Sequence, residues 1–262
     1  MPIIFGLLGL LVGSFLNVII YRVPLKRSIV TPPSACATCG TRIKTYDNIP
    51  VVSWILLRGR CRQCKSRISA DYLFVELGTG IFFGIIALKF NSNTPLLLIA
   101  FLYLAASTIA LALIDLKTHT LPNRIIFPSY FVGAILLASD ALVNQSYAAI
   151  YRAFFGAISL GFFYFMLTLI YPGGMGMGDV KFAALIGLFL GYLGWGKLLV
   201  ATFLAFVLGG IFSLCLILFR GADRKSEIPF GPWIFAGAWI GIFFGATIFH
   251  RYLSLFGLTN YA

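Results

Sequence analysis

Long apolar runs separated by short polar stretches dominate the chain. A transmembrane helix needs about 20 consecutive apolar residues, and most of these runs reach that length. The sixth run has 15 residues between two lysines, and we expect snorkelling lysines and local bilayer thinning to accommodate it. The pattern therefore predicts an all-α polytopic membrane protein with about eight transmembrane helices. The runs are Met1 to Tyr21, Tyr72 to Phe90, Pro95 to Ile114, Ile125 to Val143, Ala149 to Tyr171, Phe182 to Gly196, Leu198 to Phe219 and Phe230 to Phe249.

Composition agrees with a membrane protein and excludes an ordinary soluble domain. Of the 262 residues, 60% are hydrophobic and 11% are charged, and the mean hydropathy is +0.96. The first run lacks a basic start and a small-residue cleavage site. It is therefore expected to remain as a transmembrane helix, with the N-terminus facing outward, and not to be removed as a signal peptide.

The net charge of +12 is distributed as membrane topology requires. Ten of the twenty Lys and Arg residues lie between the first and second runs, and six more lie in three loops on the same predicted side, at 117–124, 172–181 and 220–227. Because Lys and Arg are enriched in cytoplasmic loops, these four segments should face the cytoplasm of a bacterial inner membrane. The charge then orients the chain and contacts anionic lipid, and we expect no nucleic-acid partner.

The one extended polar insert carries two pairs of cysteines. The pairs are Cys36-x-x-Cys39 and Cys61-x-x-Cys64, separated by 21 residues. Two such knuckles supply the four thiolates of a structural zinc site, whereas disulfides or a redox pair would require a less reducing compartment. We expect Zn²⁺ to supply much of the folding free energy of this small domain. The fifth cysteine, Cys215, is expected to be a buried small residue of the seventh span.

These features divide the chain into three predicted parts. Residues 1–21 form the first transmembrane helix, residues 22–71 form the cytoplasmic four-cysteine domain, and residues 72–262 form the remaining transmembrane domain.

Four of the eight acidic residues lie in or beside apolar runs, where a carboxylate is costly. Asp115 ends the third run and Asp179 precedes the sixth, so the predicted topology brings both to the cytoplasmic boundary. Asp140 falls at the outer end of the fourth run and is most simply a solvated helix end. Glu76 lies about one turn inside the second run, near the cytoplasmic side.

Two neighbouring carboxylates cannot both ionise cheaply, so one keeps a proton. The ionised partner can deprotonate water while the protonated one polarises a peptide carbonyl, which is the chemistry of aspartic proteases. Asp115 and Asp179 are therefore the predicted catalytic pair. Alternatives remain: both could cap helices, or they could hold a cation or proton in a transporter regulated by the zinc module. The chain could also be a membrane anchor whose zinc module binds a partner protein.

Several motifs resemble those of the type IV prepilin peptidase family, and together they span nearly the whole chain. Besides the cysteine knuckles, they are Gly13-Ser14-Phe15-Leu16-Asn17-Val18 with Arg22 and Pro24, Ile68 to Glu76, Asp115 to Asn123, Gly174 to Lys181 and Ile228 to Pro232. The Gly-x-Gly-Asp tetrapeptide before Val180 is also found in presenilin-type intramembrane proteases, but the cysteine insert favours the prepilin peptidase family.

The resemblance implies a fold, a reaction and partners. The family's catalytic aspartates correspond to Asp115 and Asp179, and its zinc-type cysteines to Cys36, Cys39, Cys61 and Cys64. It implies cleavage of a short basic leader from prepilins and pseudopilins of type IV pilus or type II secretion systems, just before a hydrophobic helix. It also implies N-methylation of the new N-terminus with S-adenosylmethionine. No Gly-rich nucleotide motif is present in the insert, so the residues that bind this donor stay unassigned.

Overall fold

Helices form almost all the regular structure of the protein. The computed structural model describes residues 1–90, 94–171, 173–220 and 229–257. No strand occurs among these residues, although two isolated β-bridges do. The elements are α1 (Pro2–Arg22), η1 (Thr45–Asp47), α2 (Val52–Leu56), α3 (Asp71–Lys89), α4 (Pro95–Thr118), α5 (Asn123–Val143), α6 (Tyr147–Ile170), α7 (Met177–Leu193), α8 (Trp195–Arg220) and α9 (Gly231–Leu255).

Each predicted span corresponds to a helix, which confirms the all-helical membrane fold. Seven of these helices, within the described residues, are long and apolar enough to cross a membrane. The exception is α7, which has 17 residues and corresponds to the short sixth run. The bounds differ most at the end of α9, which reaches Leu255 instead of Phe249, and beside the candidate acids. Helix α4 continues past Ile114 to Thr118, and α7 begins at Met177 instead of Phe182.

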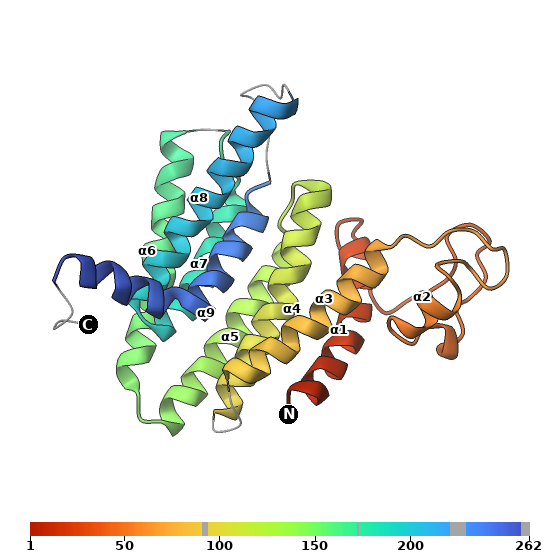
Figure 1. The fold of residues 1–262 in the computed structure, drawn as a ribbon, viewed down its shortest axis with the longest axis horizontal. Helices are drawn as coiled ribbons and strands as arrows, with labels where there is room; N and C mark the ends of the chain where they lie inside the picture. The colour runs from red at the N-terminus through yellow and green to blue at the C-terminus, as the bar shows by residue number, and fades with distance from the viewer. Residues whose placement is uncertain (91–93, 172, 221–228, 258–262) are drawn as a thin grey trace. The chain divides into compact units, whose positions relative to one another are not determined.

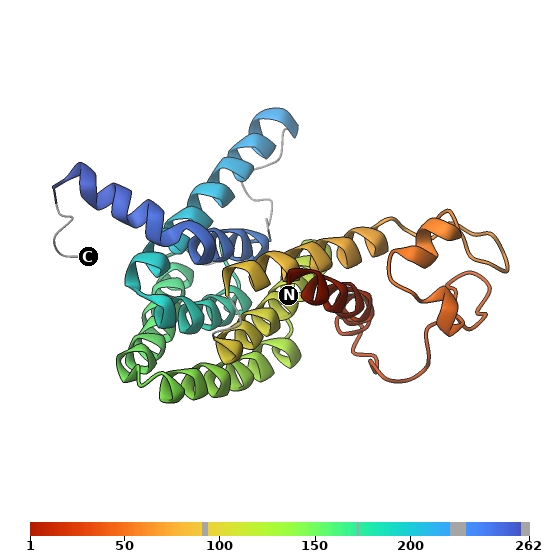
Figure 2. The same ribbon diagram turned by 60° about the horizontal axis from the view of Figure 1, so that its bottom comes forward.

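The first compact unit, Met1–Ala110, contains a close pair of helices, α1 and α3, which lie side by side in Figures 1 and 2. Glycines permit the approach. A Cβ added at Gly9 would lie 2.7 Å from the carbonyl oxygen of Thr79, and one added at Gly13 would lie 2.7 Å from the Cα of Glu76. Small residues commonly allow such contacts between membrane helices. The same face of α1 carries the buried residues Leu16 and Asn17.

The polar insert between α1 and α3 contains only short elements, η1 and α2, and is held by polar contacts. The Arg62 guanidinium donates to both carboxylate oxygens of Asp47, with distances of 2.6 to 3.0 Å. This fork connects the 3₁₀ turn to the second cysteine knuckle, and the Arg62 guanidinium also lies 5.4 Å from the centre of the Tyr46 ring. The Arg62 side chain lowers the pKa of Asp47 by hydrogen bonding and by its charge.

The second compact unit, Leu111–Ala262, is built around α7. This helix contacts α5, α6, α8 and α9, and 11 of its 17 residues are buried. Its closest neighbour is α6, against which it lies in Figure 1. Cβ atoms on Gly187 or Gly191 would collide with the backbone of α6 at Gly156 and Arg152. A helix enclosed by protein need not match the hydrocarbon thickness, which explains why α7 is short.

Two sequence predictions about single residues are wrong. Asp140 is not a solvated helix end: only 5% of it is exposed, and its carboxylate accepts a hydrogen bond of 2.5 Å from the Tyr192 hydroxyl at the far end of α7. A buried carboxylate needs such a donor, and α7 supplies it. Cys215 is not buried but exposed on α8, an outward position that an apolar thiol tolerates in a membrane helix. Most of the predicted cytoplasmic loop at 220–227 lies outside the described residues.

Candidate active site and metal centre

Asp115 lies in the last turn of α4 and faces the start of α9. Only 4% of it is exposed, and its Oδ2 accepts a hydrogen bond of 2.9 Å from the backbone N–H of Gly231, the first residue of α9. The first N–H groups of a helix have no partner within the helix, so they are free to bind an anion. A side chain at position 231 would collide with the acid, since a Cβ would lie 2.7 Å from Oδ2.

Asp179 lies in the first turn of α7 and is held in a similar way. It is 8% exposed, and its Oδ2 accepts a hydrogen bond of 3.0 Å from the N–H of Gly176, the residue that caps the helix. Its other oxygen, Oδ1, is buried without a hydrogen-bond partner among the described residues. A buried polar atom usually has a partner, so this oxygen is available to a water molecule, a proton or a substrate.

The two acids are near enough to each other for their charges to interact. Asp115 lies near the end of α4 and bonds to the first residue of α9, whereas Asp179 lies near the beginning of α7. Tyr164 of α6 lies within electrostatic range of Asp179, and its ring packs against those of Phe206 and Phe230, which also contact each other. No sequence signal points to Tyr164, because it is one aromatic residue within an apolar run.

The start of α7 is fixed by the segment that links α4 to α5. A Cβ at Gly178 would lie 2.9 Å from the Cβ of Leu121, so this glycine is needed for close packing. The Lys181 ammonium donates to the Asn123 side-chain oxygen over 3.2 Å, and the Lys181 carbonyl accepts from the Tyr130 hydroxyl over 2.6 Å. These contacts hold the first two turns of α7, and with them the carboxylate of Asp179.

The four cysteines of the insert meet in one cluster, as the sequence predicts. Their sulfurs all lie within 4.8 Å of one another, so the cluster could hold a metal ion. The two knuckles have the same backbone hydrogen bond from the first cysteine to the residue five positions later. The N–H of Cys36 donates to the carbonyl of Thr41, and the N–H of Cys61 donates to the carbonyl of Ser66, each over 2.9 Å.

Local hydrogen bonds prepare two of these sulfurs as ligands. Backbone N–H groups of Cys39 and Thr38, with the Ser66 hydroxyl, lower the pKa of Cys36 to about 5. The hydroxyl and the N–H of Ser66 lower the pKa of Cys64. Metals bind the thiolate form, so both changes favour coordination near neutral pH.

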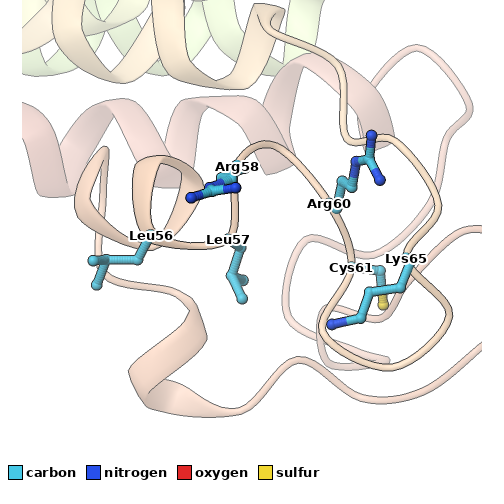
Figure 3. Close-up of a pocket in the computed structure, with 6 residues that line it drawn as sticks. All are labelled: Leu56, Leu57, Arg58, Arg60, Cys61 and Lys65. Carbon is cyan, nitrogen blue, oxygen red and sulfur yellow. The ribbon is translucent and has the colours of Figure 1, made fainter.

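A basic hollow adjoins the second knuckle. Arg58, Arg60 and Lys65 line a hollow of about 420 Å³, and Leu56, Leu57 and Cys61 complete its lining. Figure 3 shows these six residues. No acidic residue lines the hollow. The hollow therefore repels cationic molecules.

Glu76 connects α3 to the insert and has no contact that suggests catalysis. One of its carboxylate oxygens accepts a hydrogen bond of 2.7 Å from the N–H of Val51. Val51 has a φ of 63°, an unfavourable conformation for a β-branched residue, and its neighbour Pro50 is buried. The carboxylate thus holds a strained segment of the insert in place.

The fold and the site together define a class: helical membrane proteins with two buried carboxylates on separate helices. Two family models match the chain. Residues 7–90 match the bacterial Peptidase A24 N-terminal domain, and residues 102–214 match the type IV leader peptidase family. The chain belongs to the type IV leader peptidase family, which confirms the resemblance seen in its motifs.

Three curated relatives match over more than nine tenths of their length, and each carries the name prepilin leader peptidase/N-methyltransferase. The protein from Pseudomonas putida is 33% identical, with 95% of this chain and 93% of the relative covered. That from Pseudomonas aeruginosa is 33% identical, with 96% and 93% covered. That from Dichelobacter nodosus is 34% identical, with 93% and 91% covered. No solved structure gives a significant match.

Proposed function

We propose that the chain is a prepilin leader peptidase whose catalytic residues are Asp115 and Asp179. The observation that carries this proposal is the pair itself: two buried carboxylates interact electrostatically, each is fixed by one backbone N–H, and Asp179 keeps a free oxygen. The three relatives that match this chain over at least 91% of their length are named prepilin leader peptidase/N-methyltransferase.

The pair would work with one shared proton. The ionised carboxylate accepts a proton from water as the water oxygen attacks the scissile carbonyl, while the protonated carboxyl donates a hydrogen bond to the carbonyl oxygen. Collapse of the tetrahedral intermediate breaks the C–N bond, and the leaving amine takes a proton from the pair. The backbone N–H groups of Gly231 and Gly176 keep both carboxylates oriented throughout.

The substrate would be a prepilin or pseudopilin whose short basic leader ends just before a hydrophobic helix. Cleavage would occur at the cytoplasmic boundary of the inner membrane. The cationic loops at the same predicted side support this orientation, since Lys and Arg accumulate in cytoplasmic loops.

We further propose that the cysteine cluster holds structural Zn²⁺. The sulfurs of Cys36 and Cys64 are 3.8 Å apart, which fits a tetrahedron with Zn–S bonds of about 2.3 Å. All four ligands are thiolates, so no position is left open for a reacting water. The names of the relatives also support N-methylation of the new N-terminus, with S-adenosylmethionine as the donor.

Cleavage of a synthetic prepilin by the purified chain in detergent tests the peptidase, with leader loss and methyl gain read together by mass spectrometry. Asp115→Asn and Asp179→Asn should each lower the cleavage rate by about 10²- to 10⁴-fold or more, because each removes an acid–base group. Asp140→Asn is the matched control. It changes a buried aspartate of α5 that contacts the other end of α7, and it keeps an acceptor for Tyr192, so cleavage should persist. Near-normal cleavage by either dyad variant would refute the assignment.

A further inference from the structure

A second hollow of the first unit lies beside the last three turns of α1. Five residues of α1 line it at helical spacing: Leu11, Ser14, Phe15, Val18 and Arg22. They occupy the face opposite the one that packs on α3. The motif that begins at Gly13 therefore has residues on two faces of α1. One face packs on α3, and the other lines a hollow of about 320 Å³.

The insert supplies the remaining wall. Pro32, Pro33 and Pro50 contribute rigid apolar surface, and Ser34 and Asn48 contribute polar groups. Pro50 precedes the strained residue whose N–H is held by the carboxylate of Glu76. Strain of this kind persists only where surrounding contacts enforce it, and it is common at ligand sites.

We propose that this hollow binds S-adenosylmethionine, the methyl donor of the proposed N-methyltransferase reaction, on which this inference rests. Its volume is that of a small-molecule site. The Arg22 guanidinium suits the carboxylate of the donor, and one of its nitrogens already donates to the Ser28 carbonyl over 3.1 Å, which orients the group. The hydroxyls of Ser14 and Ser34 suit the ribose, while Phe15 suits the flat adenine ring.

Charge separates this hollow from the basic one beside Cys61. The donor carries an ammonium, a sulfonium and one carboxylate, so its net charge is +1. The hollow of Arg58, Arg60 and Lys65 has three cations and no acid, which repels such a molecule. The lining of the hollow on α1 also includes no acid, but Arg22 is its one cation, so the repulsion is weaker and that cation can pair with the carboxylate.

Position also favours the hollow on α1. The methyl acceptor would be the amine that cleavage leaves at the start of a hydrophobic helix, so the donor must be held at the same membrane boundary. The hollow extends from the apolar residues of α1, at Leu11, to its last residue, Arg22.

In the reaction the amine nitrogen bonds to the methyl carbon while the C–S bond of the sulfonium breaks. The products are S-adenosylhomocysteine and the methylated amine, whose extra proton passes to water.

Binding of S-adenosylhomocysteine to the purified full chain, measured by titration calorimetry, tests the site without turnover. Arg22→Gln should weaken binding at least ten-fold, and Val18→Trp should block it by filling the hollow. Arg58→Gln is the matched control and should leave the affinity unchanged. Metal content and leader cleavage are measured on the same preparations, and their retention shows that each variant is folded.

The outcomes distinguish this inference from the proposed function. If the wild-type chain cleaves and methylates, yet Arg22→Gln and Val18→Trp bind the ligand as tightly as it does, the hollow is not the donor site. Equal weakening by Arg58→Gln would also overturn the assignment. If the wild-type chain cleaves but neither methylates nor binds the ligand, the methyltransferase proposal fails together with this one.

Discussion

At the scale of the residue, the candidate acids are held by backbone and not by charged side chains. Gly231 and Gly176 each donate one N–H to a carboxylate, and each stands where a helix begins. Helix starts present unpaired donors and the positive end of the helix dipole. A carboxylate can therefore be fixed there by backbone donors.

Gly231→Ala should displace Asp115 and reduce leader cleavage. The added Cβ would lie 2.7 Å from Oδ2 and 3.1 Å from Cγ of the acid. Overpacking of this kind costs about 1–3 kcal/mol, which is about a 5- to 150-fold loss in kcat/KM if it falls on the transition state. Initial rates of prepilin cleavage measure the effect.

A double-mutant cycle identifies the cause. In an Asp115→Ala background the new methyl group has less to collide with, so the thermal destabilisation caused by Gly231→Ala should shrink. Gly78→Ala controls for the substitution itself, because no atom lies within 4 Å of its added Cβ. Undiminished cleavage by Gly231→Ala would contradict the geometry of Asp115 described above.

The sequence singled out both candidate acids because charge is rare in apolar segments. It could not identify Gly231 as the donor to Asp115, since every residue except proline has a backbone N–H and the contact spans 116 positions. Asp140 was misjudged for a related reason. Its partner, Tyr192, is 52 positions away in the sequence. The sequence therefore shows only that Asp140 ends a hydrophobic run, which suggests solvent exposure, although the residue is buried.

At the scale of the element, α7 explains how Asp179 is positioned. The helix is enclosed by four others, and its contact with α6 leaves no room for side chains at Gly156, Gly187 and Gly191. Sequence periodicity gave the helices and most of their bounds within a few residues. It placed the start of α7 and the end of α4 too close to the apolar core, because Lys181 precedes the sixth apolar run and Asp115 ends the third.

Gly187→Ala should destabilise the α6–α7 pair. The added methyl group would collide with the Gly156 carbonyl, at an expected cost of about 1–3 kcal/mol in unfolding free energy. Thermal unfolding in detergent measures this loss as a lower midpoint temperature.

Gly210→Ala is the control, and it is expected to change the thermal stability in the opposite direction. It lies on α8 with open space around its Cβ, and alanine is about 1 kcal/mol better than glycine in a helix interior. Its midpoint should stay level or rise. A fall as large as that of Gly187→Ala would mean that collision with α6 is not the cause.

At the scale of the whole molecule, the metal cluster and the acid pair belong to different compact units. The four cysteines lie within Met1–Ala110, and both aspartates lie within Leu111–Ala262. The spacing of the cysteines predicted their cluster without any knowledge of the fold, because knuckle geometry is local. The hollow on α1 was not predictable, since its walls come from α1 and from a loop of irregular backbone.

Removal of the metal should therefore affect methylation more than cleavage. The proposed zinc would hold the two knuckles together, and the insert that contains them forms one wall of the proposed donor site. Cys61→Ser with Cys64→Ser should abolish metal content, and methyl transfer should fall by a larger factor than leader cleavage. Metal analysis and mass spectrometry of the same reaction give both values.

Cys215→Ser is the control, because this exposed cysteine of α8 is outside the cluster. It should keep the metal and both activities. An equal loss of cleavage and methylation in the double cysteine variant would show that the metal supports both units alike.

The unpaired Oδ1 of Asp179 has a consequence for inhibitor chemistry. A compound with a tetrahedral secondary alcohol in place of the scissile amide could donate its hydroxyl hydrogen to that oxygen, gaining an interaction that the flat amide of a substrate lacks. Leader-length peptides with such a replacement at the cut site are thus the natural starting point for selective blockers of this enzyme.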